Sequence, residues 1–99
     1  MKYGLEESII EQILNIINKY NKYNFKLFGS RARGDYSEKS DIDIAIFENV
    51  EKNKEYEIRN DFDELDIIYK IDLVFVTDKT KKELLDSIKR DGVDFNEKI

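Results

Sequence analysis

Apolar residues recur at helical spacing near the start of the chain. Between residues 5 and 20 they return every three or four positions, which predicts an amphipathic helix with one buried face. Glu6 and Glu7 near its start and Lys19 and Lys22 near its end suit the dipole of such a helix. The residues of the predicted buried face are Leu5, Ile9, Ile13, Ile16, Ile17 and Tyr20.

Three shorter segments have the patterns of β-strands. Residues 24–28 (NFKLF) form a short apolar run that stops at Gly29. Residues 41–47 (DIDIAIF) alternate, with three isoleucines on one face and two aspartates on the other. Residues 70–76 (KIDLVFV) are the most apolar run in the chain, which predicts the central strand of the sheet.

Two further helices are predicted in the second half of the chain. Residues 54–66 repeat apolar side chains at i, i+4 and i+7, and Asn53 is expected to cap this helix at its start. The last helix is expected to begin with a capping box of Thr80 and Glu83 and to stop at Gly92.

The order of these elements predicts the fold class. It runs helix, strand, loop, strand, helix, strand, helix, which favours a small mixed β-sheet with helices packed on it, of the α/β or α+β class. A chain of 99 residues is the size of one domain, so we expect residues 1–99 to form a single unit.

Composition then removes several classes of chemistry. The chain has no cysteine and no histidine, which excludes disulfides, thiolate nucleophiles, His-dependent triads and His- or Cys-ligated metals. A formal net charge of −5 disfavours direct nucleic-acid binding. No apolar run approaches the length of a membrane span or of a signal peptide core, so a cytoplasmic protein without a membrane partner is expected.

Three aspartates are candidates for metal binding. Asp41 and Asp43 are two positions apart on a predicted strand and therefore share a face. Asp72 interrupts an apolar strand, where a carboxylate without a neutralising partner is costly. If the two strands are neighbours, the three acids can bind Mg²⁺, which prefers oxygen ligands. Acids at strand starts are also commonly only solvated, so the pair alone does not decide between the two interpretations.

The loop between the first two strands is a candidate phosphate site. Gly29 directly follows a strand and allows close backbone approach, and Ser30 offers a hydroxyl and its N–H. If residues 30–33 form a short helical turn, its free N–H groups, together with Arg31 and Arg33, suit an anion. Taken alone, a Gly-Ser turn is more often an ordinary surface loop.

The spacing of these features resembles a known family. Gly29-Ser30, ten residues and Asp41-x-Asp43, followed by a later acid in IDLV (residues 71–74), is similar to the nucleotidyltransferase superfamily that includes DNA polymerase beta. Within it, GSRARGDYSEKSDIDIAI resembles the minimal nucleotidyltransferase (MNT) family most, and the resemblance extends over roughly residues 5–95. It implies a polymerase beta-like nucleotidyltransferase fold.

The resemblance also implies an activity. MNT proteins act as antitoxins that transfer AMP from ATP to a tyrosine of a HEPN-type RNase toxin. By this analogy Gly29, Ser30, Arg31 and Arg33 bind the nucleotide. The three aspartates hold two Mg²⁺ ions, with Asp72 nearest the acceptor hydroxyl and able to accept its proton. The larger relatives hold their acceptor with additional domains, so another chain is expected to present it here.

Two alternatives remain open on the sequence. The first is an antitoxin that binds its toxin without catalysis. The second is a nucleotidyltransferase that acts on RNA ends or on a small molecule, although the acidic net charge disfavours RNA.

Overall fold

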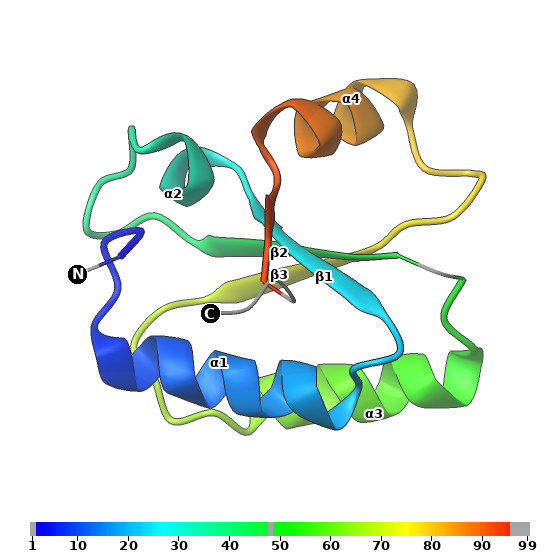
Figure 1. Cartoon of the computed structure of the whole chain (residues 1–99), viewed down its shortest axis with the longest axis horizontal. Helices are drawn as coiled ribbons and strands as arrows, with labels where there is room; N and C mark the ends of the chain where they lie inside the picture. Colours follow the sequence, from blue (N-terminus) through cyan, green and yellow to red (C-terminus); the bar gives the residue numbers. More distant parts are fainter. Residues whose placement is uncertain (1, 48, 96–99) are drawn as a thin grey trace.

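A mixed sheet of four strands forms the centre of the computed structural model, which describes residues 2–47 and 49–95. The strand order is β3-β2-β1-β4, with β2 antiparallel to β1 and parallel to β3 (Figure 1). The elements are α1 (Glu7–Lys19), β1 (Asn24–Phe28), α2 (Ser30–Arg33), β2 (Ile42–Phe47), α3 (Lys52–Asp63), β3 (Ile71–Phe75), α4 (Lys82–Asp91) and β4 (Val93–Asp94). The predicted small mixed sheet with packed helices is confirmed.

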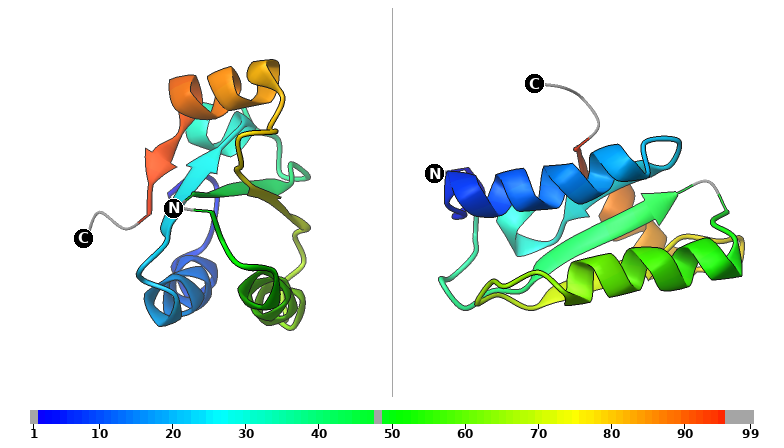
Figure 2. Two further views of the ribbon diagram at one scale, coloured as in Figure 1. Left: turned by 90° about the vertical axis from the view of Figure 1, so that its right-hand side faces the viewer. Right: turned by 90° about the horizontal axis from the view of Figure 1, so that it is seen from below.

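The helices lie on both faces of this sheet. α1 and α3 run side by side under one face, and α2 and α4 lie on the other (Figure 2). Ile42, Ile44 and Ile46 of β2 are completely buried within the larger core, to which α1 and α3 contribute. A smaller cluster of Phe28, Ala45 and Ile88 joins the sheet to α4. None of the helices in the described ranges has the length and apolar character that a bilayer crossing requires.

β2 and β1 are the interior strands of the sheet, so the prediction that residues 70–76 form its central strand is wrong. β3 lies at an edge, and all five of its residues are partly exposed. An apolar run indicates that both faces of a strand contact other elements. This holds for β3, because its partly buried apolar side chains pack against the larger cluster on one face and the smaller cluster on the other. Such a run does not report how many strands lie beside it.

Two of the predicted helix caps are also wrong. Asn53 lies inside α3, and its side-chain oxygen accepts a hydrogen bond from the N–H of Lys54. Thr80 precedes the cap of α4, and its hydroxyl accepts from the N–H of Thr77, 2.9 Å away, closing the turn before the helix. Both side chains use local partners outside the capping geometry. α4 does stop at Gly92, as expected, but with an extended backbone (φ −66°).

A polar contact joins α1 to α3 at the edge of the core. The hydroxyl of Tyr20 donates to Asp61 at 2.6 Å, and the ammonium of Lys19 lies 3.0 Å from the same carboxylate oxygen. The hydrogen bond from Tyr20, with a further contribution from Lys19, lowers the pKa of Asp61 against the opposing effect of burial. Burial and the contact with Asp61 raise the pKa of Tyr20 to about 12.

This contact makes a testable contribution to stability. Tyr20→Phe should lower the free energy of unfolding by roughly 1–2 kcal/mol, because it removes a hydrogen bond to a charged group. Asp61→Asn should cost a similar amount at neutral pH. Because the folded-state pKa of Asp61 is lowered, the stability that its ionised form adds is complete above the unfolded pKa of about 3.9 and is lost as pH falls through the folded pKa. Urea unfolding at pH 7 and pH 3 measures both effects.

The matched control for this contact is Asp63→Asn. Asp63 is exposed at the end of α3, so this variant should differ from the wild type by less than about 0.5 kcal/mol. A Tyr20→Phe variant as stable as the wild type would contradict the assigned contact.

Candidate functional site

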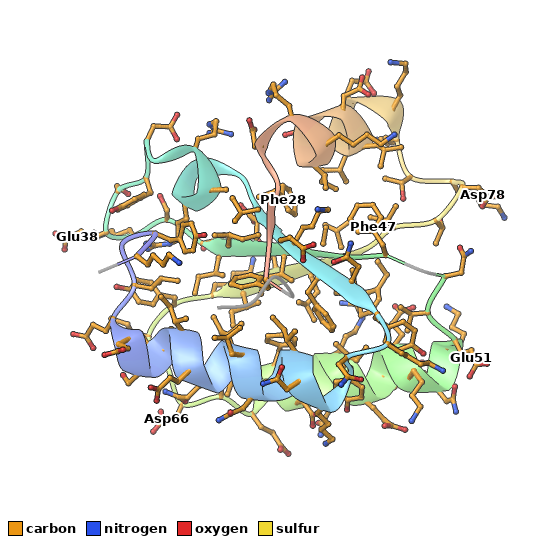
Figure 3. The ribbon with its side chains drawn as sticks, in the orientation of Figure 1. Phe28, Glu38, Phe47, Glu51, Asp66 and Asp78 are labelled. Atoms are coloured by element: carbon orange, nitrogen blue, oxygen red, sulfur yellow. The ribbon has the colours of Figure 1, made fainter. Side chains whose placement is uncertain are left out.

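Strand register brings the Gly-Ser turn and two of the predicted carboxylates together. Phe28, the last residue of β1 (Figure 3), pairs with Asp43 of β2, and Asp43 pairs in turn with Asp72 of β3. Paired residues on neighbouring strands share a face of the sheet, and Phe28 packs toward α4. Asp43 and Asp72 therefore lie on the face that carries α2 and α4, and Asp41, two residues before Asp43, precedes the same strand.

Gly29 contacts Asp43 so closely that no side chain fits between them. A Cβ built on Gly29 would collide with the Oδ2 atom of Asp43. The backbone of Gly29 also has φ +79° and ψ −159°, a conformation that essentially only glycine adopts. Glycine is therefore required at this position both by backbone conformation and by the neighbouring carboxylate.

The predicted helical turn after Gly29 is present. α2 is a short helix of four residues, Ser30–Arg33, and the N–H of Arg33 donates to the carbonyl of Gly29 at 3.0 Å. Ser30 is the first residue of this turn and is partly exposed. The use of the turn as a phosphate site remains a prediction.

Asp43 lies at the centre of a concentration of negative charge. Burial raises the pKa of Asp43, and the charges of Asp72 and Asp41 raise it further. Arg33 opposes this effect without cancelling it. The three acids are thus close enough to repel one another, and a cation bound among them would relieve that repulsion.

The donor chemistry of this site fits Mg²⁺, although the side chains do not converge on one point. Among the described residues, no three acidic side chains are gathered closely enough to hold an ion as they stand. Asp72 instead lies 3.5 Å from the ammonium of Lys70 and is 41% exposed. Carboxylate oxygens are ligands that Mg²⁺ takes in proteins, and Asp41, Asp43 and Asp72 are the residues that would hold it.

The ion pair with Lys70 was not predicted from the sequence. Lys70 stands two positions before Asp72 at the entry to β3, and residues two apart on a strand share a face. That spacing is a signal that sequence reasoning could have used. It means that Asp72 has a neutralising partner, contrary to the expectation for a lone acid in an apolar strand.

Arg31 does not lie where a phosphate could reach it. Arg31 is 1% exposed, and its guanidinium donates to the carbonyl of Ser40 through Nε at 3.1 Å and Nη2 at 2.9 Å. Nη1 donates to the carbonyls of Tyr3 at 2.9 Å and Gly4 at 3.3 Å. The structure gives the predicted contact of Arg31 with the nucleotide no support, because the donors of this side chain are used inside the protein.

Arg33, unlike Arg31, is partly exposed. Its side chain is 40% exposed, and it lies 3.2 Å from Asp35 and 3.2 Å from Asp91 of α4. The hydrogen bonds that its guanidinium donates to these two carboxylates raise the pKa of Arg33. Arg33 also lowers the pKa of Asp43 through its charge, so this cation lies near the acidic site.

Comparison with known proteins gives the same family for most of the chain. The family model described as "Polymerase beta, Nucleotidyltransferase" matches residues 11–98. A "putative protein adenylyltransferase" of Methanocaldococcus jannaschii is 45% identical over 49 residues, which are 46% of this chain and 49% of that relative. The match thus spans about half the length of the relative.

Two solved structures share the fold. A chain from the crystal structure of a toxin–antitoxin with AMP-PNP superposes with a TM-score of 0.64 at 23% identity, over 86% of this chain and 70% of that one. A "putative nucleotidyltransferase" from Sulfolobus solfataricus superposes with a TM-score of 0.54, also at 23% identity, over 96% of this chain and 87% of that one. With the family model covering the sheet, the Gly-Ser turn and all three aspartates, the chain belongs to the polymerase beta nucleotidyltransferase family.

Proposed function

We propose that this nucleotidyltransferase is a protein adenylyltransferase that transfers AMP from ATP to a tyrosine hydroxyl of a HEPN-type toxin and so acts as its antitoxin. The observation that carries the proposal is the contact of Gly29 with Asp43, which stands beside Asp72. The name of the relative and the toxin–antitoxin neighbour with AMP-PNP support this choice of reaction and partner. ATP as substrate favours a cytoplasmic location.

Each residue of the site has a proposed role. Gly29 lets the triphosphate approach the backbone, and Ser30 offers its N–H and hydroxyl to a phosphate oxygen. Arg33, exposed beside the acids, is the cation available to the departing pyrophosphate.

The three aspartates would hold two Mg²⁺ ions, which when bound would polarise the α-phosphoryl group and favour the ionised acceptor. The tyrosyl oxygen then forms a bond to the α-phosphorus while the bond to pyrophosphate breaks. Asp72 is the proposed acceptor of the tyrosyl proton, since the chain has no histidine. Its exposure on edge strand β3 leaves it accessible to a second protein.

The direct test is transfer of label from [α-³²P]ATP to a purified HEPN-type toxin in the presence of Mg²⁺. The wild type should label the toxin on tyrosine, and Asp43→Asn should reduce the rate by at least about 100-fold. Metal chemistry contributes several kcal/mol, and each 1.4 kcal/mol corresponds to a factor of ten.

The control for this test is Asp66→Asn, the same substitution at an exposed residue on the side of the sheet that carries α1 and α3 (Figure 3). This variant should label the toxin at the wild-type rate. Neutralisation of the toxin without any labelling would establish a binding antitoxin in place of the proposed enzyme.

The charge repulsion at the site predicts a second effect. In metal-free buffer Asp43→Asn should raise the melting temperature by a few degrees, because the half-buried carboxylate of Asp43 faces the charges of Asp41 and Asp72. Asp72→Asn should raise it less, since that substitution also removes the pair with Lys70. Differential scanning calorimetry in EDTA measures both, and a lower melting temperature for Asp43→Asn would contradict the repulsion.

Substitutions at two glycines distinguish the effect of backbone strain from an effect on nucleotide binding. Gly29→Ala should weaken binding of Mg·ATP by at least about tenfold, because its Cβ collides with Asp43. Gly34→Ala is the matched control: Gly34 also has a positive φ, of +97°, but a Cβ there meets nothing within 4 Å. Gly34→Ala should lose roughly 1–2 kcal/mol of stability through left-handed backbone strain, and Gly29→Ala should lose more, because its backbone conformation is less accessible to alanine and its Cβ meets Asp43. Only Gly29→Ala should lose nucleotide affinity by titration calorimetry.

A further inference from the structure

The buried guanidinium of Arg31 connects the two halves of the nucleotide site. We propose that Arg31 is a positioning residue that holds the peptide before Asp41 at a fixed place relative to the Gly29–Ser30 turn, and that the N-terminal turn at residues 2–5 exists to complete its coordination. The proposal rests on the proposed function and deepens it. It requires no direct contact between Arg31 and the nucleotide.

The two ends of the Arg31 side chain lie at the two parts of the candidate site. The backbone of Arg31 directly follows Ser30 in α2, and two of its nitrogens donate to one oxygen, the carbonyl of Ser40, at 3.1 and 2.9 Å. Ser40 directly precedes Asp41. The side chain therefore links the turn proposed for phosphate to the peptide that carries the first metal-binding aspartate, across a loop of ten residues.

Within the described residues, the charge of Arg31 is compensated without a carboxylate. It is the buried charged residue among the described side chains, and no carboxylate in residues 2–47 and 49–95 forms an ion pair with it. Carbonyl oxygens and two aromatic rings take that place: the guanidinium lies 5.2 Å from the ring centre of Tyr36 and 4.6 Å from that of Tyr69. A planar fork that both stacks and donates is a property of arginine that lysine lacks.

The N-terminal turn has an unfavourable backbone conformation. Tyr3 and Gly4 both have positive φ, +58° and +71°, and the N–H of Leu5 donates to the carbonyl of Lys2 at 2.9 Å. Two consecutive positive φ values are unfavourable for a turn that contains tyrosine. This turn directs the carbonyls of both Tyr3 and Gly4 at the Nη1 atom of Arg31, so that the strain is compensated by hydrogen bonds to a buried cation.

The space around Gly4 is filled by the same cluster. A Cβ on Gly4 would collide with the ring of Tyr36 and lie 2.8 Å from Nη1 of Arg31. Gly4 is therefore a position from which the guanidinium can be displaced without changing any residue proposed to touch substrate. Tyr69 extends the cluster to β3, because the next residue, Lys70, accepts a hydrogen bond from the N–H of Ile42 at 2.9 Å.

A fixed Ser40–Asp41 peptide matters because ligands held in place bind an ion without an ordering cost. If the guanidinium is lost, Asp41 must be ordered when the ion binds, so more Mg²⁺ is needed to reach the same nucleotide complex. If Arg31 had only a structural role, its substitution would lower stability without changing the Mg²⁺ concentration that the nucleotide complex requires. The Mg²⁺ requirement therefore distinguishes positioning from structure.

The test measures thermal stabilisation by AMP-PNP as Mg²⁺ is titrated, with no acceptor protein present. We expect Arg31→Lys and Gly4→Ala to need about tenfold more Mg²⁺ than the wild type for half of the maximal shift. Excess Mg²⁺ should restore the full shift. Arg59→Lys, at an exposed arginine of α3, is the matched control and should follow the wild-type curve.

Each outcome of this titration decides a specific point. If the wild type shows no shift with Mg²⁺ and AMP-PNP, the proposed function is wrong and this inference fails with it. If the wild type responds and Arg31→Lys responds at the same Mg²⁺ concentration, Arg31 is only structural. Tyr36→Ala removes one ring at a residue 37% exposed, so it should fold even if Arg31→Lys does not. An unchanged Mg²⁺ requirement in Tyr36→Ala would then overturn the proposal.

Discussion

Burial of the isoleucine face of β2 is the constraint on which the rest of the structure depends. Ile42, Ile44 and Ile46 are completely buried among residues of α1 and α3, and alternation along a strand then directs Asp43 to the opposite face. A slip of one residue would place the carboxylate in the core and the isoleucines outside it. The hydrophobic effect thus determines the position of a polar site that it does not contact.

The two faces of the sheet therefore differ: one holds the larger core and the other holds the candidate site. One face is covered by α1 and α3 and holds the larger core, whereas α2 and α4 lie on the other face, where α4 forms a smaller cluster with the sheet. The candidate site lies on this second face, where β1 ends at Gly29 and β3 places Asp72 beside Asp43. The edge position of β3 leaves the carboxylate of Asp72 partly exposed beside Asp43.

Two charged residues of this region differ in whether their charge is compensated. Arg31 is buried, and carbonyl oxygens and aromatic rings compensate its charge. Asp43 is half-buried, and its pKa is raised by burial and by neighbouring acids. The first arrangement stabilises one conformation of the loop, and the second leaves negative charge for a cation to neutralise. Family membership is consistent with this division, since nucleotidyl transfer needs ligands that are both ordered and charged.

What the sequence by itself determined was local in origin. Periodicity identified the helices and strands, and the spacing from Gly29 to Asp43 indicated a turn that faces an acidic strand, because alternation is a property of each segment alone. Strand order, the pairing of Lys70 with Asp72 and the buried state of Arg31 were decided only by the tertiary structure. The sequence next to a Gly-Ser turn is the same whether its arginine binds a phosphate or a backbone carbonyl. Which of the two it binds depends on segments distant in sequence that fold around it.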